Sequence, residues 1–433
     1  MWREEDGDEG TGVPPVALAH PWWIPSFLGR LPELEPRHLS LLGFVSLALL
    51  FENYDFSLLT AALPFIARSL DLPEAALGDF TGMIRLGALP AFLVVPFADR
   101  LGRRRVFLAA VLGLSAGTFA TGFSQTVGQF VAIQVFTRTC MLTAATIAFV
   151  IVAEELPAAS RGWGIGMLGA LASLGHGLSA LLFSAIDVLP FGWRSLYAVG
   201  LVPIFFFARF RTGVPETRRF RALAAGQVLG GWLSPLRELA LRFPGRAVGV
   251  ALLALGSAGA QGSVYQFTAQ FLLEHRGWAP GQYSLLVLTA GALGFVGNLL
   301  AGRLGDRLGR RVVGALFLGV FPGLAWAFLH ARGAALALSW GFLVFSLTAS
   351  GVIMRAFATE LFPTSYRGTA TGWVTAMETV GSAAGLALVS LGMRGGLSLV
   401  EALELVSLLA LAGAAVVLCF PETKRRELES ISG

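Results

Sequence analysis

The stretch Asp99–Arg104 reads DRLGRR, and the same letters return in the second half of the chain at Asp306–Arg311. Two further motifs recur in the same order and at nearly the same spacing. Glu154-x-x-Pro157 with Arg161-Gly162 returns as Glu360-x-x-Pro363 with Arg367-Gly368, and Pro215-Glu216-Thr217 returns as Pro421-Glu422-Thr423. Chance could supply one such pair, but hardly three that share an order and a spacing. The sequence therefore predicts two related halves.

The composition indicates a membrane protein. Hydrophobic residues make up 55% of the 433 residues, charged residues make up 14%, and the mean hydropathy is +0.70. A typical soluble domain has about 25% charged residues, and a transmembrane helix needs roughly 20 mainly apolar residues. We predict an all-α membrane protein with twelve transmembrane helices in two pseudo-symmetric six-helix bundles. The predicted spans are 39–66, 76–98, 105–124, 128–153, 163–187, 193–211, 246–272, 281–304, 312–330, 334–358, 368–393 and 400–420.

The longest polar stretch separates the sixth predicted span from the seventh. We expect five regions: an N-terminal segment at 1–38, a bundle at 39–211, a linker at 212–245, a second bundle at 246–420 and a tail at 421–433. Arginines gather in the loops that follow even-numbered spans, and the other loops hold few. By the positive-inside rule, both termini and the linker are expected in the cytoplasm. The near absence of lysine and the short loops favour a bacterial inner membrane.

The repeated loop motifs resemble the signature of the major facilitator superfamily. The Glu-x6-Arg pairs and the Pro-Glu-Thr motifs are similar to those of its sugar-porter and organic-ion branches. The resemblance covers residues 40–430 and implies the twelve-helix transporter fold, with monomer as the default state. The chain departs from the pattern at Val95, which stands where the first loop motif usually has a glycine. Span seven also carries Gln261 and Tyr265-Gln266 instead of paired glutamines, which argues against a sugar substrate.

The resemblance also implies two charged networks that break and reform during transport. One would join Asp99, Arg103, Glu154 and Arg161, with Arg104 beside it, and the other Asp306, Arg310, Glu360 and Arg367, with Arg311 beside it. Partly exposed ion pairs contribute roughly 0–1 kcal/mol each, which suits a reversible gate. The alternative is that these arginines set the topology or bind lipid head groups.

Ionisable residues inside the spans are candidates for function because they are costly in a bilayer. Asp55 in span one and Arg138 in span four are predicted at similar depth. The sugar-porter resemblance implies that such a pair couples transport to protons. Glu52 is either a second titrating site or a carboxylate that faces the inner vestibule. Burial favours the neutral carboxylic acid and a nearby arginine favours the charged form, so movement of Arg138 could exchange a proton. The alternative is a static ion pair that fixes helix packing.

Further polar residues in the spans are candidates for binding the solute. Arg85 and Arg138 could bind a carboxylate or phosphate, and Glu378 could attract a cation, titrate or bond to a neighbouring span. The remaining candidates are His176, Gln261, Tyr265, Gln266, Asn298 and Trp373. His176 is as readily a core histidine, and Trp373 either lines the cavity or packs. Arg355 is placed near the cytoplasmic end of its span, where gating or topology fits it better than solute binding.

The sequence contains no phosphate-binding loop and no His/Cys cluster with metal spacing, so we expect no cofactor other than the proton as coupling ion. Cys140 and Cys419 fall inside apolar runs. We predict a secondary transporter, not an enzyme, that moves a small polar organic solute, an anion or zwitterion, by proton-coupled symport. The partners are solute, protons and lipid, and not nucleic acid. A proton-coupled exporter, an uncoupled facilitator and a receptor that senses solute remain the alternatives.

Overall fold

The computed structural model describes residues 34–217, 234–363 and 366–422. Most of the predicted N-terminal segment, the middle of the linker and the tail after residue 422 lie outside these ranges. Within them every regular element is helical, as predicted. Nine helices in the described part are long and apolar enough to cross a membrane by length and composition.

Six transmembrane segments form the N-terminal half. Three of them are long single helices, α1, α6 and α7, whereas the second and sixth segments are broken into short pieces. The elements are α1 (Pro36–Ser69), η2 (Glu74–Ala76), α2 (Leu77–Leu86), α3 (Ala91–Val94), η3 (Val95–Phe97), α4 (Ala98–Leu101), α5 (Arg103–Thr121), α6 (Val127–Glu155), α7 (Ala158–Phe183), η4 (Ile186–Val188), α8 (Trp193–Tyr197), η5 (Ala198–Gly200), α9 (Leu201–Phe205) and α10 (Phe207–Gly213).

The second half repeats the arrangement with straighter helices. Its seventh segment ends in a short π-helix, and its last segment is α19 followed by α20. The elements are α12 (Ser234–Arg242), α13 (Pro244–Gln266), α14 (Thr268–Gln270), η6 (Phe271–His275), α15 (Pro280–Leu308), α16 (Arg310–His330), α17 (Gly333–Glu360), α18 (Arg367–Arg394), α19 (Leu399–Ser407) and α20 (Leu409–Cys419). The twelve predicted spans therefore correspond to helical segments of the structure.

The break in the second segment, which the predicted spans did not include, has a local cause. Between α2 and α3 the chain turns at Gly87–Pro90, where glycine weakens the helix and proline has no N–H to donate.

The predicted linker also contains a helix, α12. The Tyr366 hydroxyl donates to Glu238 of α12 at 3.0 Å, and this bond holds the pKa of Tyr366 above its usual value of 10.0. Thus α12 is attached to the C-terminal half.

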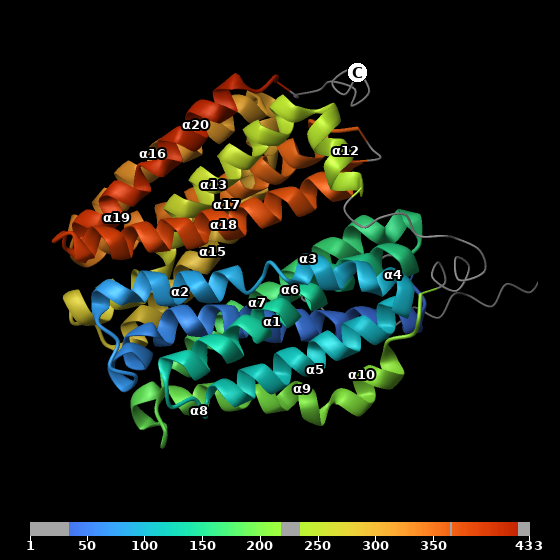
Figure 1. Ribbon diagram of the computed structural model, residues 1–433, viewed down its shortest axis with the longest axis horizontal. Helices are drawn as coiled ribbons and strands as arrows, with labels where there is room; N and C mark the ends of the chain where they lie inside the picture. The colour runs from blue at the N-terminus through green and yellow to red at the C-terminus, as the bar shows by residue number, and fades with distance from the viewer. Residues whose placement is uncertain (1–33, 218–233, 364–365, 423–433) are drawn as a thin grey trace, which may run out of the picture.

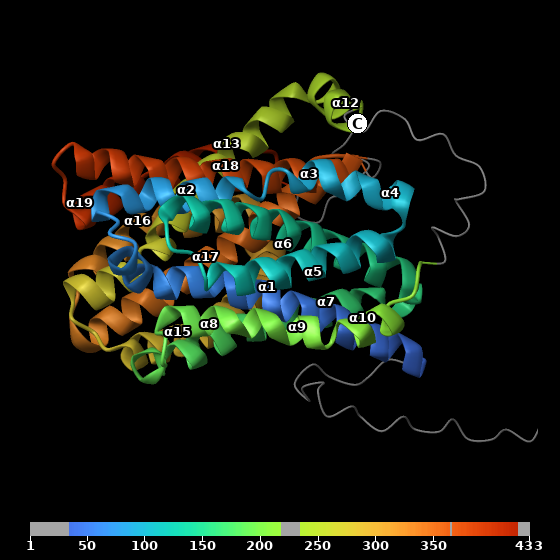
Figure 2. The same cartoon turned by 60° about the horizontal axis from the view of Figure 1, so that its bottom comes forward.

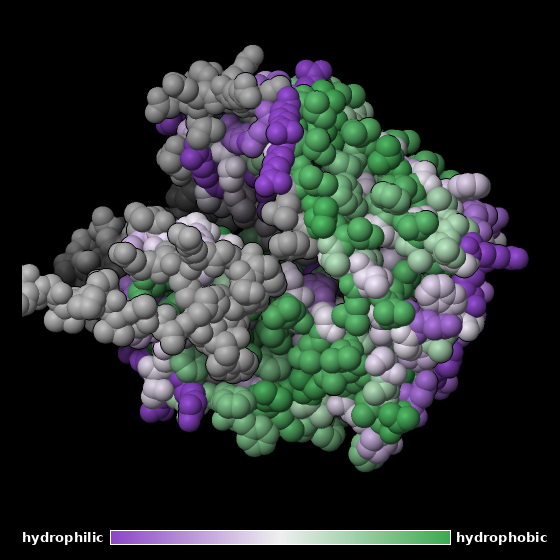
Figure 3. All heavy atoms as spheres, turned by 180° about the vertical axis from the view of Figure 1, so that it is seen from behind, coloured by the Kyte–Doolittle hydropathy of each residue, from purple (hydrophilic) through white to green (hydrophobic). Residues whose placement is uncertain are grey.

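The halves lie side by side along two helix pairs, α2 with α18 and α7 with α15 (Figures 1 and 2). We call the end that carries the turns at Gly102 and Gly309 the motif end. The opposite end, which carries Glu74 and Glu274, is the far end. In Figure 3 hydrophobic residues cover the middle of the visible face, and hydrophilic residues gather towards both ends. Such a belt fits the hydrocarbon core of a membrane.

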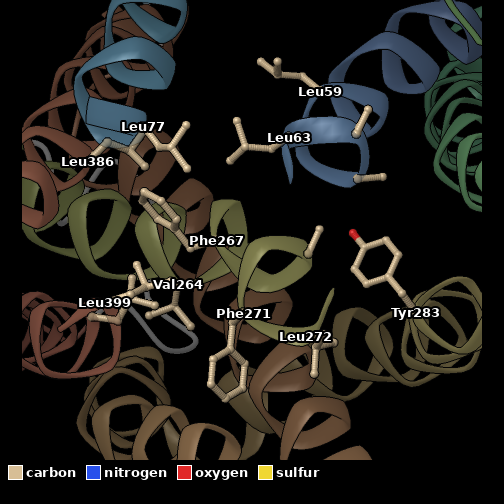
Figure 4. Packing of buried hydrophobic residues seen from close by; sticks show 14 of the residues in the cluster. Leu59, Leu63, Leu77, Val264, Phe267, Phe271, Leu272, Tyr283, Leu386 and Leu399 are labelled. Atoms are coloured by element: carbon tan, nitrogen blue, oxygen red, sulfur yellow. The ribbon is translucent and has the colours of Figure 1, made fainter. Parts of the chain in front are cut away.

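The buried apolar residues form three clusters, and their distribution differs between the two ends. At the far end one cluster includes residues of both halves, and Figure 4 shows Leu63 and Leu77 facing Phe267 and Leu386. Towards the motif end there are two separate clusters, one in each half. The halves therefore share a core at the far end and have their own cores at the motif end.

Candidate functional site

A cavity of about 750 Å³ lies between the two halves. Its walls come from α1, α2, α6 and α7 of the first half and from α13, α15, α17 and α18 of the second. Six ionisable side chains line it: Glu52, Arg85, Arg138, His176, Arg355 and Glu378. Five of these six were singled out from the sequence as site candidates. The cavity lies in the region where we expected the solute to bind.

Two arginines from different helices lie over one aromatic ring. The guanidinium carbon of Arg85 is 4.4 Å from the centre of the Phe56 ring, and that of Arg138 is 4.7 Å from the same centre. The faces of aromatic rings attract such cations. Phe56 was not among the predicted site residues, although it stands one helical turn after Glu52 on the same face of α1.

Arg85 also bonds across the two halves. Its Nη2 donates to Oε1 of Gln266 at 2.9 Å, and the Thr60 hydroxyl donates to the same oxygen at 3.3 Å. Gln266 is 1% exposed, and its amide nitrogen has no hydrogen-bond partner in the described residues. The predicted solute ligand Gln266 is therefore a residue behind the wall that holds Arg85 in position.

The predicted pair of Asp55 and Arg138 is not an ion pair in this structure. Asp55 is 0% exposed and accepts a hydrogen bond from the Thr118 hydroxyl of α5 at 2.9 Å. Gln134 of α6 lies beside this carboxylate, and its amide donates to the Thr121 hydroxyl at 3.1 Å. Arg138 lines the cavity instead, near enough for its charge to interact with Asp55 and Glu52. Glu52 lines the cavity, and Asp55 lies behind the wall.

The second half contributes a different set of groups. Glu378 of α18 and Arg355 of α17 both line the cavity, so Arg355, which we had assigned to gating or topology, is a cavity residue. Gln261 donates to the Ser350 hydroxyl at 2.8 Å, and the Tyr265 ring stacks on Trp340 with centres 6.0 Å apart. These aromatic rings make one wall flat and apolar.

Three further predictions can be placed. His176 lines the cavity, and its ring centre is 6.2 Å from that of Phe56. Trp373 does not line the cavity: its indole N–H donates to the carbonyl of Ala247 at 3.0 Å, so the binding prediction for Trp373 was wrong and the packing alternative holds. The side chain of Asn298 lies outside the described residues.

Polar contacts join the halves at the far end. Arg68 pairs with Glu274, and Glu74 accepts from Gln270 at 3.0 Å and lies 2.7 Å from Nε2 of His275. Another pair joins Arg394 to Asp79 at 2.8 Å. These contacts were not predicted, because no periodicity or motif connects two loops that are distant in the sequence.

The ion pairs assigned between described residues at the motif end each lie within one half. Arg103 lies 3.3 Å from Glu154, and Arg310 pairs with Glu360 and lies 3.2 Å from Asp306. Neither Arg161 nor Arg367 forms an ion pair with a described residue. The side chain of Asp99 is not described. Arg104 donates from its side chain to the carbonyl of Arg211.

The Pro-Glu-Thr motifs have a structural role that the sequence did not indicate. Glu216 accepts from the backbone N–H of Arg104 at 3.2 Å, and Glu422 accepts from those of Arg310 and Arg311 at 3.0 and 3.2 Å. Each carboxylate thus lies at the N-terminus of α5 or α16, where free N–H groups and the helix dipole favour negative charge. Gly102 and Gly309 precede these helices with φ of 100° and 105°, a conformation that favours glycine.

Known proteins resemble this chain over most of its length. The gallate transporter of Pseudomonas putida is 26% identical, over 89% of this chain and 92% of that protein, and the niacin transporter NiaP of Acinetobacter baylyi is 26% identical, over 91% and 96%. The crystal structure of the D-xylose-proton symporter has a TM-score of 0.72 at 19% identity, over 89% of this chain and 98% of that one.

The family model named Major Facilitator Superfamily matches residues 45–386 and 250–430. These overlapping matches cover most of the chain and agree with the twelve-helix fold and its central cavity. The homologues are transporters and not enzymes, as predicted. The chain therefore belongs to the Major Facilitator Superfamily and is a membrane transporter.

Proposed function

We propose that this protein carries a small organic anion, an aromatic or unsaturated carboxylate, across the membrane together with protons. The observation that carries the proposal is that most of the six acidic and basic side chains that line the cavity have no partner in the described part of the protein. Among the described residues, Arg85 alone of the six has a hydrogen-bond or ion-pair partner for its side chain. Unpaired charges at this depth are costly, so a ligand that pairs with them is favoured.

A carboxylate and an aromatic ring fit the two features of this cavity. A guanidinium group binds a carboxylate through two parallel hydrogen bonds, and both Arg85 and Arg138 face the same space. The rings of Phe56, Tyr265 and Trp340 offer apolar surfaces for a planar ligand. The names of two relatives agree with this chemistry, because gallate and niacin are aromatic carboxylates.

The distribution of the cores supports transport by alternating access. The shared core and the polar pairs close the far end, whereas each half has its own core at the motif end. We take the motif end as cytoplasmic, because its loops are rich in arginine. The structure then corresponds to an inward-facing state, with both termini in the cytoplasm of a bacterium.

Asp55 and Glu52 are the groups that we propose to carry the proton. Asp55 lies near Arg138, so a solute carboxylate that binds Arg138 changes the charge that Asp55 experiences. Solute binding and protonation would then be linked through Arg138. Import driven by the proton gradient follows from this linkage.

The test uses purified full-length protein in liposomes that contain a pH-sensitive dye. Benzoate, nicotinate and gallate are compared with choline, alanine and glucose as added solutes. We expect benzoate, nicotinate and gallate to enter and to acidify the lumen, and we expect choline, alanine and glucose to stay outside. Entry of carboxylate without acidification would replace symport by facilitated diffusion, and entry of choline or glucose but not of carboxylates would overturn the proposed substrate class.

A further inference from the structure

The α18 wall of the cavity offers hydrogen-bond acceptors. Thr375, Glu378 and Thr379 of α18 all line the cavity. The Thr375 hydroxyl donates to the carbonyl of Thr371 at 3.1 Å, and the Thr379 hydroxyl donates to that of Thr375 at 2.9 Å. Each hydroxyl has one proton, so each threonine presents only oxygen lone pairs to the cavity. An ionised Glu378 likewise has acceptors alone.

The carboxylate of Glu378 has no hydrogen-bond or ion-pair partner among the described residues, although the side chain is mostly enclosed. Arg355 lines the same side of the cavity, and its charge interacts with that of Glu378, but the two do not form an ion pair. Arg355 is exposed, near the motif end of α17. A hydrogen-bond donor of a solute that reaches the Glu378 carboxylate therefore does not compete with a described protein group.

We propose that the solute carries a hydrogen-bond donor at the end opposite its carboxylate, and that Glu378 with Thr375 and Thr379 recognises this donor. The proposal rests on the proposed function, in which Arg85 and Arg138 bind the carboxylate. A phenolic hydroxyl or a protonated ring nitrogen meets the requirement. A second carboxylate at that position is repelled, because it would place an anion against Glu378 and two oxygen lone pairs.

Arg85, Arg138 and Phe56 belong to the first half, together with Glu52, whereas Glu378 belongs to the second half, together with Arg355. A solute that bonds to both walls joins the halves across the cavity. A solute that lacks the donor bonds to one wall and leaves the α18 acceptors unpaired, so it is expected to bind more weakly.

The experiment compares three ligands that differ at one position: benzoate, 4-hydroxybenzoate and terephthalate. Dissociation constants are measured by calorimetry on purified full-length protein in detergent. We expect the wild type to bind 4-hydroxybenzoate about tenfold more tightly than benzoate, as one hydrogen bond to a charged group provides. Terephthalate is expected to bind more weakly than benzoate.

The variant Glu378→Gln tests whether Glu378 recognises the hydrogen-bond donor of the solute. The ratio of the benzoate to the 4-hydroxybenzoate constant is expected to fall from about ten to about one to three, because the charged acceptor is lost. Terephthalate should gain affinity relative to benzoate, since the amide of glutamine can donate to it. Thr379→Val should lower the ratio in the same direction. Glu404→Gln, which removes a carboxylate in α19 beside His330, is the charge-matched control, and its ratio should equal that of the wild type.

The outcomes separate the two proposals. A wild-type protein that binds none of the three carboxylates contradicts the proposed function itself. A wild-type protein that binds benzoate and 4-hydroxybenzoate equally overturns the donor proposal and leaves the carboxylate site intact. If Glu378→Gln weakens both ligands by the same factor, Glu378 serves the fold or the carboxylate end, and the donor proposal is wrong.

Discussion

Asp55 and Arg138 lie on different sides of the cavity wall and make no ion pair. Asp55 is enclosed and accepts from Thr118 of α5, and Arg138 faces the cavity over the ring of Phe56. A buried ion pair would hold both groups in one arrangement. Without it, Arg138 is available to a solute and Asp55 to a proton, and this separation is the basis of the first prediction.

Asp55→Asn should abolish solute accumulation against a gradient and preserve solute exchange. Asparagine has nearly the shape of aspartate and can still accept from Thr118, but it cannot release or take up a proton. Uptake into liposomes driven by a pH gradient should fall to the equilibrium level. Counterflow, in which unlabelled solute inside exchanges with labelled solute outside, should continue.

Glu52→Gln is the companion variant, because Glu52 lies on the same helix and lines the cavity. If Asp55 carries the proton alone, Glu52→Gln accumulates solute and Asp55→Asn does not. Accumulation by Asp55→Asn at the wild-type level would contradict the role of Asp55. Loss of counterflow in Asp55→Asn would show instead that the carboxylate serves the fold or solute binding.

Arg138→Lys should weaken carboxylate binding by about tenfold or more, because lysine cannot form the two parallel hydrogen bonds of a guanidinium group. Arg85→Lys should have an effect of similar size and should also disturb the bond to Gln266 that crosses the halves. The measurement is the dissociation constant for benzoate by calorimetry. Arg100→Lys, an exposed substitution at the motif end, is the control. An unchanged constant in both cavity variants would exclude the arginine site.

The sequence predicted which helices contribute charges to the cavity but not which way each side chain faces. Positions along a helix follow from a rise of 1.5 Å per residue, and this placed Asp55, Arg85 and Arg138 at similar depth. A step of three residues also rotates a side chain by about 60° from its starting direction. That rotation was enough to bring Glu52 into the cavity and to leave Asp55 behind the wall.

Contacts between distant loops could not be predicted at all. The far-end pair of Arg68 with Glu274 depends on how the two halves are placed against each other, and no local pattern encodes that placement. The capping of α5 by Glu216 is a similar case, since the repeated Pro-Glu-Thr motif was visible but its partner was not. The prediction that Trp373 binds the solute failed for another reason. The indole N–H donates to the backbone carbonyl of Ala247, and the sequence does not distinguish such a packing role from a role at the cavity.

Gly78→Ala should impair transport more than it impairs folding. A Cβ at Gly78 of α2 would lie 2.0 Å from the carbonyl oxygen of Leu386 and 2.6 Å from the Ser390 hydroxyl, both in the other half. Overpacking of this kind costs about 1–3 kcal/mol. The clash exists only in the conformation in which the halves meet at the far end. The population of that conformation therefore falls by about fivefold to 150-fold. Uptake by the folded protein should fall accordingly.

Gly175→Ala is the matched control, because its clash lies inside one half. A Cβ there would lie 2.1 Å from the carbonyl oxygen of Leu50 and 2.8 Å from the Tyr54 amide nitrogen, both in α1. This variant should lower the melting temperature of the purified protein in detergent. If Gly78→Ala lowers the melting temperature as much and leaves uptake per folded molecule unchanged, the far-end contact of α2 with α18 does not govern transport.

Reversal of the charge at Arg68 should loosen the far end, and a double reversal should restore it. Arg68→Glu places an anion opposite Glu274, whereas Arg68→Glu combined with Glu274→Arg rebuilds the pair in the opposite sense. The pair is partly exposed, and such pairs contribute about 0–1 kcal/mol, so the shift in population is at most about fivefold for the lost attraction, with a further shift from repulsion. Transport would slow, because the carrier leaves the inward-facing state too readily.

The measurement is the rate at which a thiol reagent that does not cross membranes labels a cysteine placed in the cavity, Ala258→Cys, in right-side-out vesicles. The reagent reaches the cavity only from the far end, so labelling reports how often that end opens. Arg68→Glu should label faster than the parent, and the double reversal should label at the parent rate. If the single and the double variant label equally fast, the effect comes from the altered loops and not from the pair, and the far end is held closed by the shared apolar core alone.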